Sequence, residues 1–222
     1  MPGNSRPVQS SQTDVHPDLA ERVQRHLTRP WRRPLARHNL DAYALLAAWR
    51  RERGSERPVW LDSGCGTGRA AVTLALQYPE RLVVGIDQSE QRLARGRIRF
   101  APLPDNLLLL RAECADIWRL MQADGWQIER HLLLYPNPWP KPAHLLRRWQ
   151  GHPVLPSLLA ISATLELRTN WQPYAREMAQ ALVLAGWQAR VAPLFPPQPL
   201  TDFEAKYQSS HHDLWQVLGS PN

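Results

Sequence analysis

Residues 59–68 read Val-Trp-Leu-Asp-Ser-Gly-Cys-Gly-Thr-Gly, and this segment constrains the fold more than any other. A short apolar run ends in Asp62, and Gly64, Gly66 and Gly68 follow at two-residue spacing. The apolar periodicity that comes next, over 70–78, predicts a helix. A strand must therefore turn sharply into a helix while its backbone stays bare enough for a ligand to approach. Glycine permits both the unusual φ values and the close approach.

A second apolar run over 82–86 predicts another buried strand, which ends in Asp87. A carboxylate at this place can accept the hydroxyl hydrogens of a ribose. The third glycine comes one residue earlier than in the dinucleotide pattern G-x-G-x-x-G. The segment resembles the S-adenosylmethionine-binding loop of Rossmann-like methyltransferases, which implies that Asp62 helps to hold the methionine part and Asp87 the ribose. A glycine-rich turn without a ligand is the alternative, and the ordered succession of strand, acid, glycines, helix, strand and acid favours the cofactor.

Strand and helix patterns alternate along the chain. Strands are expected at 58–62, 82–86, 106–110, 129–135, 163–169 and 187–192. Helices are expected at 40–53, 68–78, 89–99, 115–122 and 171–185. This alternation predicts an α/β fold with a doubly wound, mainly parallel sheet. The resemblance to Rossmann-like methyltransferases implies that the sheet is Rossmann-like and seven-stranded, with helices on both faces. In such a sheet, ligands bind beyond the carboxyl ends of the strands.

Composition narrows the class of protein. The chain has 222 residues, of which 43% are apolar, and no apolar run approaches the roughly 20 residues of a membrane span. The N-terminus is polar and shows no apolar signal core.

The candidate metal ligands lack the spacing of a metal site. The two cysteines, Cys65 and Cys114, do not have metal-ligand spacing, and the segment His211-His212-Asp213 has no third ligand at a suitable distance in the sequence, so we expect no metal. Two cysteines without a disulfide pattern favour the cytoplasm, and nothing in the sequence favours a monomer over a homodimer.

Positive charge concentrates near the N-terminus. Residues 1–57 hold 11 arginines and 6 acidic residues, a difference of 5 within a formal net charge of +7. Six arginines lie between Glu21 and Asp41 with no acidic residue among them: Arg22, Arg25, Arg29, Arg32, Arg33 and Arg37. A basic segment of this kind favours a phosphate backbone as partner. The alternative is a general preference for arginine on a solvated surface, since the chain has 25 arginines and two lysines.

Three further segments point to one family. Residues 135–141 read Tyr-Pro-Asn-Pro-Trp-Pro-Lys, residues 168–174 read Arg-Thr-Asn-Trp-Gln-Pro-Tyr, and residues 201–204 read Thr-Asp-Phe-Glu. They resemble the signatures of the bacterial tRNA (guanine-N(7)-)-methyltransferases, which are Phe-Pro-Asp-Pro-Trp-x-Lys, Thr-Asp-x-x-x-Tyr and Thr-x-Phe-Glu. With the glycine loop, the resemblance spans about 39 to 215. It implies a methyltransferase domain over 39–222, preceded by a basic, largely flexible arm over 1–38.

The resemblance also implies a role for each matching residue. S-adenosylmethionine is the implied cofactor, and its implied binding residues are Asp62, Gly64, Gly66, Gly68, Asp87, Glu113 (on the adenine side) and Asn137. Asn137 is also the implied catalytic residue. The implied substrate-binding residues are Lys141, Asn170, Thr201 and Glu204. The phosphates of the tRNA partner are expected at Arg32, Arg33, Arg147 and Arg148.

Two departures from the family pattern leave alternatives open. Asn137 and Asn170 stand where the family has aspartates, and the tail after Glu204 lacks the family's glycine-rich continuation. One alternative is another base specificity, because Asn-Pro-Trp-Pro is loosely similar to the [Asp/Asn]-Pro-Pro-aromatic loop of amino-methyltransferases. Another is an RNA-binding homologue that binds the cofactor but has little or no activity.

The chemistry of guanine N(7) decides what the two asparagines should cost. This nitrogen carries a lone pair, so transfer needs positioning of the reactants and no prior removal of a proton. A charged hydrogen bond contributes about 1.5–3 kcal/mol and a neutral one about 0.5–1.5. Two such replacements lower the binding of the transition state by about 2–3 kcal/mol, which corresponds to about 30- to 150-fold in rate. We therefore expect the variant with both Asn137→Asp and Asn170→Asp to methylate tRNA faster by about this factor. Single-turnover rates measure the effect, and an unchanged or lower rate would contradict it.

Overall fold

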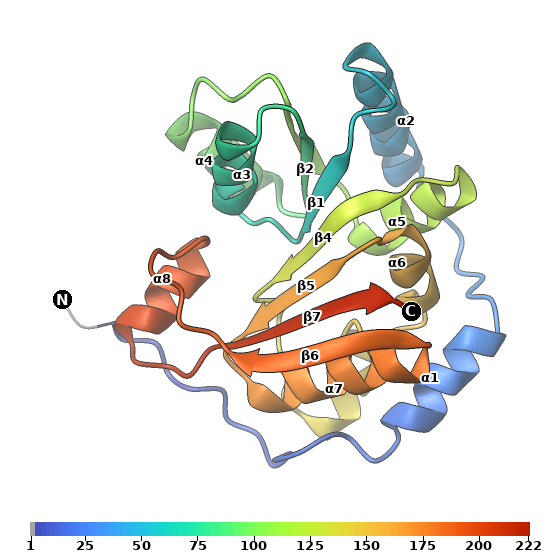
Figure 1. Ribbon diagram of the computed structural model, residues 1–222, viewed down its shortest axis with the longest axis vertical. Coiled ribbons are helices and arrows are strands. Elements are labelled where there is room, and N and C mark those ends of the chain that lie inside the picture. The colour runs from blue at the N-terminus through green and yellow to red at the C-terminus, as the bar shows by residue number, and fades with distance from the viewer. Residues whose placement is uncertain (1–2) are drawn as a thin grey trace. The chain divides into compact units, whose positions relative to one another are not determined.

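The computed structural model describes residues 3–222, which include a seven-stranded sheet (Figure 1). The strands are β1 (Val59–Ser63), β2 (Leu82–Asp87), β3 (Leu107–Arg111), β4 (Ile128–Leu134), β5 (Leu165–Thr169), β6 (Trp187–Pro193) and β7 (Trp215–Pro221). Their order in the sheet is β3-β2-β1-β4-β5-β7-β6. β1 pairs in parallel with β2 and β4, and β2 with β3, whereas β7 runs antiparallel to both β5 and β6. The expected α/β class with a mainly parallel sheet is confirmed.

Eight α-helices and one 3₁₀ helix accompany the strands in the described part of the chain. The α-helices are α1 (Leu19–Thr28), α2 (Arg37–Glu52), α3 (Arg69–Gln77), α4 (Glu90–Arg99), α5 (Cys114–Ala123), α6 (Leu155–Ile161), α7 (Gln172–Leu184) and α8 (Asp202–Ser209). The 3₁₀ helix spans Pro142–Arg147. The elements named from the sequence lie within a few residues of their expected bounds. No sequence pattern described above assigns residues to the short helices α1, α6 and α8, to the 3₁₀ helix or to the seventh strand, β7.

The chain folds into two compact units. Unit 1 takes the residues up to 32 together with 133–159 and 164–222. Unit 2 takes residues 33–132 and 160–163. The boundary expected at residue 38 therefore does not coincide with a unit boundary, because the chain passes into unit 2 at residue 33.

Unit 2 is built on β3, β2, β1 and the larger part of β4. All six residues of β2 and all five of β1 are buried, as expected for parallel strands that are covered on both faces. Helix α3 packs against β1, β2 and β3, and α4 against β2 and β3, while α2 packs against α5 and β3. In Figure 1, α3 and α4 lie on one side of β1 and β2 and α2 lies on the other.

A buried polar network joins β1, β4 and α5 inside unit 2. His131 on β4 is fully buried, with its Nε2 2.8 Å from Ser63 Oγ and its Nδ1 2.7 Å from Ser162 Oγ. The indole N–H of Trp118 donates to the same Ser63 oxygen at 3.1 Å. Burial lowers the pKa of His131 to about 3, so the ring is neutral at ordinary pH. Its nitrogens serve packing of the sheet, and the ring has no exposed surface for a ligand.

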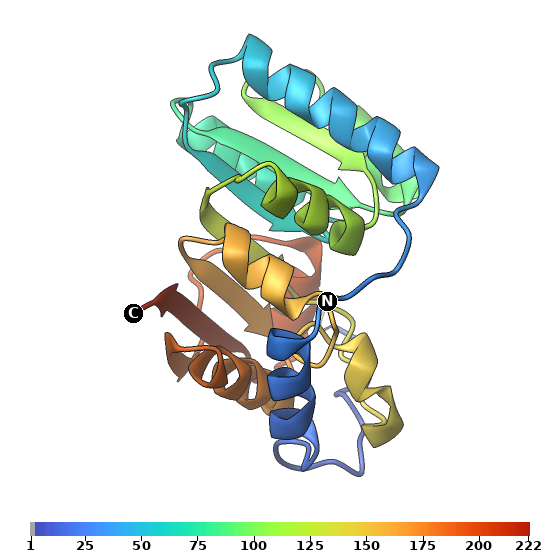
Figure 2. The ribbon, with the colours of Figure 1, turned by 90° about the vertical axis from the view of Figure 1, so that its right-hand side faces the viewer.

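In unit 1, α7 packs against β5, β6 and β7, and α1 packs against α7 (Figure 2). Leu19 and Val23 give α1 its apolar stripe, and both side chains are fully buried. The segment expected to be a flexible arm thus contains a helix with two core residues. Two of its arginines form ion pairs within a helix, Arg25 with Glu21 and Arg37 of α2 with Asp41.

One glycine in unit 2 marks the closest approach of a helix to the glycine loop. A Cβ added at Gly96 on α4 would lie 1.9 Å from the carbonyl oxygen of Thr67. The helix can pack there only without a side chain, because a backbone atom cannot move aside as a side-chain tip can.

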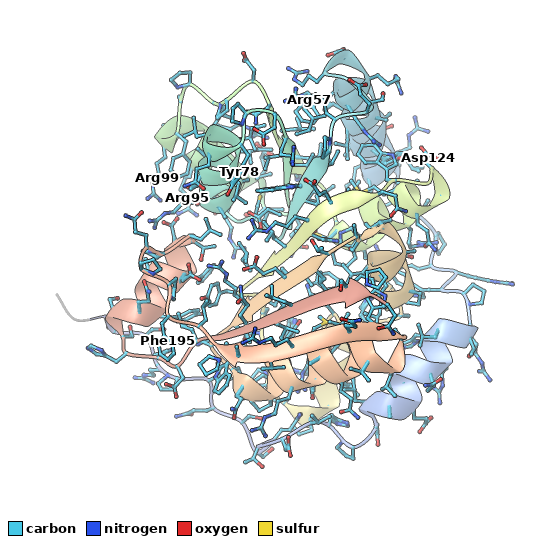
Figure 3. The ribbon with its side chains drawn as sticks, in the orientation of Figure 1. Arg57, Tyr78, Arg95, Arg99, Asp124 and Phe195 are labelled. Carbon is cyan, nitrogen blue, oxygen red and sulfur yellow. The ribbon has the colours of Figure 1, made fainter. Side chains whose placement is uncertain are left out.

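Gly96→Ala should therefore destabilise the protein although alanine is the better helix former. We expect the overpacking to lower the free energy of unfolding by about 1–3 kcal/mol, more than the roughly 1 kcal/mol gained in helix propensity. Denaturant unfolding measures the change. Arg95→Ala is the control, because Arg95 is exposed on the same helix (Figure 3). A Gly96→Ala variant as stable as the control would refute the close packing.

Candidate functional site: a glycine loop in unit 2 and a rigid proline loop in unit 1

The glycine loop, residues 64–68 after β1, has the positive φ angles that its glycines predict. Gly64, Gly66 and Gly68 have φ angles of 80°, 62° and 78°, in the left-handed region. A Cβ added at Gly64 or Gly66 would meet no atom within 4 Å, so the backbone borders open space. A Cβ at Gly68 would lie 2.7 Å from a side-chain methyl of Leu109, so any side chain here would have to displace Leu109 as well as adopt a left-handed backbone. The first two glycines thus leave room for a ligand along the loop.

Two carboxylates flank this open space. Asp62 ends β1 and Asp87 ends β2, and in the parallel register Asp62 lies opposite Gly85. Asp87 Oδ2 accepts from the N–H of Gly66 at 2.9 Å, and its Oδ1 accepts from Ser89 N–H at 2.8 Å. Asp62 is 2% exposed, and burial, followed by the charge of Asp87, raises its pKa to about 7. A cationic ligand beside Asp62 would relieve this unfavourable charge, which fits the sulfonium and ammonium of S-adenosylmethionine.

Glu113 stands at the start of α5 in the same unit. Its backbone N–H donates to Asn39 Oδ1 at 3.0 Å, and Asn39 Nδ2 donates to Asp116 at 2.7 Å. Its carboxylate forms an ion pair with Arg33. The acid expected on the adenine side and an arginine expected to bind phosphate are therefore partners of each other. Both side chains remain partly exposed.

In unit 1, the loop that follows β4, residues 135–141, has a strained backbone and is called the proline loop here. Tyr135 and Trp139 have φ angles of 53° and 44°, in a region that bulky residues rarely adopt. Strained residues of this kind cluster at functional sites, where the surrounding structure holds them in place. Asn137 lies exposed between them, and its Oδ1 accepts from the N–H of Trp139 at 3.2 Å.

A buried cluster holds this loop. Arg148 has no exposed surface, and it donates to the carbonyl oxygens of Trp139 and Lys141, both at 3.2 Å. Its guanidinium forms an ion pair with Glu177 of α7 at 2.7 Å, and Gln12 of the N-terminal segment bonds to both charged groups. The expectation that Arg148 binds an RNA phosphate is wrong for this structure, because all of its surface is buried within unit 1. Its place in the fold makes it the residue that fixes the loop.

The C-terminal motif forms the start of α8. Thr201 caps the helix, since its Oγ1 accepts from the N–H of Glu204 at 2.9 Å. Glu204 is fully buried, and its Oε1 accepts from the Tyr135 hydroxyl at 2.7 Å and from Arg168 at 3.0 Å. Burial, followed by the charge of Glu204, raises the pKa of the Tyr135 hydroxyl, which therefore stays protonated. Glu204 thus connects α8 with the start of the proline loop and with β5.

The remaining predicted residues of unit 1 differ in exposure. Asn170, after β5, is half-buried, and its Nδ2 lies 3.1 Å from Nδ1 of His212. Lys141, Arg147 and Arg32 are exposed. The guanidinium of Arg147 lies 4.7 Å from the centre of the Trp139 ring, which places it over the proline loop. These three cations remain available to phosphate.

The comparisons with known proteins agree with the motifs. Residues 56–217 match the model of a protein family described as "Putative methyltransferase". The tRNA (guanine-N(7)-)-methyltransferase of Pectobacterium atrosepticum is 30% identical over 180 residues, which cover 74% of this chain and 73% of that protein. The chain belongs to the tRNA (guanine-N(7)-)-methyltransferase family. The enzyme of the same name from Photorhabdus laumondii is 28% identical over 176 residues, with the same coverage.

Solved structures confirm the fold. The 16S rRNA methyltransferase KamB superposes with a TM-score of 0.60 at 21% identity, covering 86% of this chain and 95% of its own. A variant of the 16S rRNA (adenine(1408)-N(1))-methyltransferase from Catenulisporales acidiphilia, solved with its cosubstrate SAM, gives a TM-score of 0.56 at 22% identity. It covers 79% of this chain and 91% of its own. Among residues 3–222, no helix is both long and apolar enough to cross a membrane.

Sequence reasoning missed three residues that organise the proline loop and the segment after β5 in unit 1. Glu177 and Gln12 complete the buried cluster around Arg148, and His212 contacts Asn170. A carboxylate at an apolar position of the helix over 171–185 was a usable signal for Glu177, because a buried charge needs a partner. Nothing in the sequence near Gln12 or His212 marks either residue as a neighbour of the site.

The raised pKa of Asp62 predicts how cofactor affinity depends on pH. Only the ionised carboxylate attracts a cation, and its fraction rises about tenfold between pH 6 and pH 8 for a pKa of about 7. We expect the dissociation constant for S-adenosylmethionine to fall by up to about tenfold over this interval. Calorimetric titration at several pH values measures it. In the Asp62→Asn variant, affinity should be weaker and this part of the pH dependence absent; a full dependence there would exclude Asp62 as its source.

Proposed function

We propose that this protein transfers a methyl group from S-adenosylmethionine to N(7) of a guanine in tRNA. The observation that carries the proposal is the strained loop 135–141, whose position is fixed by the buried Arg148 and whose Asn137 and Lys141 are exposed. This loop carries one of the three family signatures that are far more specific than the glycine loop. The tRNA methyltransferase names of the relatives support the same substrate.

The chemistry asks little of the protein beyond positioning. When bound, S-adenosylmethionine supplies an electrophilic methyl group, and guanine N(7) offers its lone pair without losing a proton first. Asp62, Asp87 and the open backbone of Gly64 and Gly66 would hold the cofactor in unit 2. In unit 1, Asn137 and Asn170 would orient the base. Neutral amides suffice for this purpose, because orientation of the reactants and not proton transfer sets the rate.

The cations of unit 1 would hold the RNA backbone. Lys141 and Arg147 are exposed in and just after the proline loop, and Arg32 is exposed in the N-terminal segment. Phosphate contacts of this kind position a nucleic acid without reading its sequence. A tRNA substrate also implies that the protein acts in the cytoplasm. Glu204 and Arg148 would act through the loop and α8 that they hold, since both are fully buried.

In the deciding experiment, the protein is incubated with labelled S-adenosylmethionine and with bulk tRNA from cells that lack their own guanine-N(7) methyltransferase. The labelled nucleoside is then identified. We expect labelled 7-methylguanosine. Another labelled nucleoside would replace the proposal with a different base specificity. No label, from protein that binds the cofactor, would refute catalysis on tRNA and favour an RNA-binding homologue.

The two lysines of the chain supply a matched pair of variants for the same assay. Lys141→Ala should weaken tRNA binding and reduce the slope of log affinity against log salt by about one, because one phosphate contact is lost. Lys206→Ala removes an exposed lysine from α8 and should leave the slope unchanged. Equal slopes for the two variants would remove Lys141 from the RNA contacts.

A further inference from the structure

The tail after Glu204 closes α8 with a Schellman motif. The N–H of His212 donates to the carbonyl of Tyr207 at 3.0 Å, and the N–H of His211 donates to that of Gln208 at 3.0 Å. His211 adopts the left-handed backbone, with a φ of 57°, that the motif usually assigns to glycine. The motif brings the last residue of the turn over the helix. The rings of His212 and Tyr207 accordingly stack with centres 5.2 Å apart and an angle of 17° between planes.

The stacked ring of His212 has a different partner on each nitrogen. Nε2 lies 3.0 Å from the carbonyl oxygen of Ser5, and Nδ1 lies 3.1 Å from Nδ2 of Asn170. A carbonyl oxygen can only accept, so Nε2 carries the proton and donates to it. In the neutral ring Nδ1 is then an acceptor, and the Asn170 amide donates through Nδ2. The N-terminal segment thus fixes which ring nitrogen is protonated.

This chain of hydrogen bonds determines which end of the Asn170 amide is available. Because Nδ2 is bound to His212, Oδ1 is the free end, and no donor among the described residues pairs with it. We propose that His212 is a positioning residue that presents Asn170 Oδ1 as the acceptor for the N–H donors of the target guanine. The inference rests on the function proposed above. It assigns His212 and Ser5 a part in substrate orientation.

The arrangement relates two departures of this chain from its family's pattern. An aspartate at position 170 would offer two equivalent acceptor oxygens and would need no orienting partner. An asparagine has one acceptor and one donor end, and the wrong end would repel the N–H donors of guanine. The tail that lacks the family's glycines supplies His212, which holds the amide in the useful orientation. The neutral acceptor therefore depends on a neighbour that a carboxylate would not require.

A double-mutant cycle tests this dependence. His212→Phe keeps a ring to stack on Tyr207 but removes both nitrogens, and we expect kcat/KM for tRNA methylation to fall about three- to tenfold. In the Asn170→Asp background the same substitution should change kcat/KM by less than about twofold, because a carboxylate has no wrong end. His212→Gln retains one acceptor and one donor and should restore most of the loss. His211→Gly, the matched control, keeps the left-handed turn and should retain full activity.

An equal loss from His212→Phe in both backgrounds would overturn the proposal and leave His212 a packing residue. A second measurement needs no activity. Nitrogen-15 NMR of the histidine rings should show His212 protonated at Nε2 and unprotonated at Nδ1, with the signal assigned by its absence in His212→Phe. A ring protonated at Nδ1 would refute the amide orientation. If the wild-type protein methylates no tRNA, the proposed function fails, while the NMR result still decides the hydrogen-bond arrangement.

Discussion

A buried ion pair between Arg148 and Glu177 is the interaction on which the rest of unit 1 depends. Neither side chain has any exposed surface, and the guanidinium contacts both carboxylate oxygens, at 2.7 and 2.9 Å. Two buried charges are tolerated only where their other donors and acceptors are satisfied, and loss of one partner would cost about 3–5 kcal/mol. Arg148 satisfies its remaining donors on the backbone of the proline loop. Stability of the unit and geometry of the loop therefore rest on the same contacts.

This coupling explains how the proline loop keeps two bulky residues, Tyr135 and Trp139, in the left-handed region of the backbone. A residue in a disfavoured backbone region costs about 1–3 kcal/mol, and the surrounding contacts must exceed that cost. Tyr135 is fixed by Glu204 of α8, and Trp139 by Arg148 and by Arg147 over its ring. The loop is thus held from two sides before any substrate arrives. Such pre-organisation is what an in-line methyl transfer needs, because its rate depends on the orientation of the reactants.

The sequence predicted the parts of this protein that are encoded locally. Apolar periodicity located the helices and strands of the sheet, and the glycine triplet predicted its own backbone, because each signal lies within a few neighbouring residues. It could not predict that Arg148 would be buried, because Glu177 lies 29 positions away and Gln12 lies 136 positions away. The same reason hid His212, whose ring partners are Ser5 and Asn170. The expectation for Arg148 came from the basic pair that it forms with Arg147 after the proline loop, and only the tertiary fold distinguishes the buried Arg148 from the exposed Arg147.

In the role proposed for them above, Asn137 and Asn170 would illustrate what a site can change when its chemistry requires no proton transfer. Losing a general base would stop catalysis, whereas exchanging a carboxylate for an amide at an orienting position weakens a hydrogen bond and adds a requirement for orientation. Asn137 and Asn170 each have one end engaged: Oδ1 of the first accepts from Trp139 N–H, and Nδ2 of the second donates to His212. Asn137 therefore offers a donor and Asn170 an acceptor. A guanine has both an acceptor at O6 and donors on its neighbouring edge, so a pair of oppositely oriented amides can recognise it without any charge.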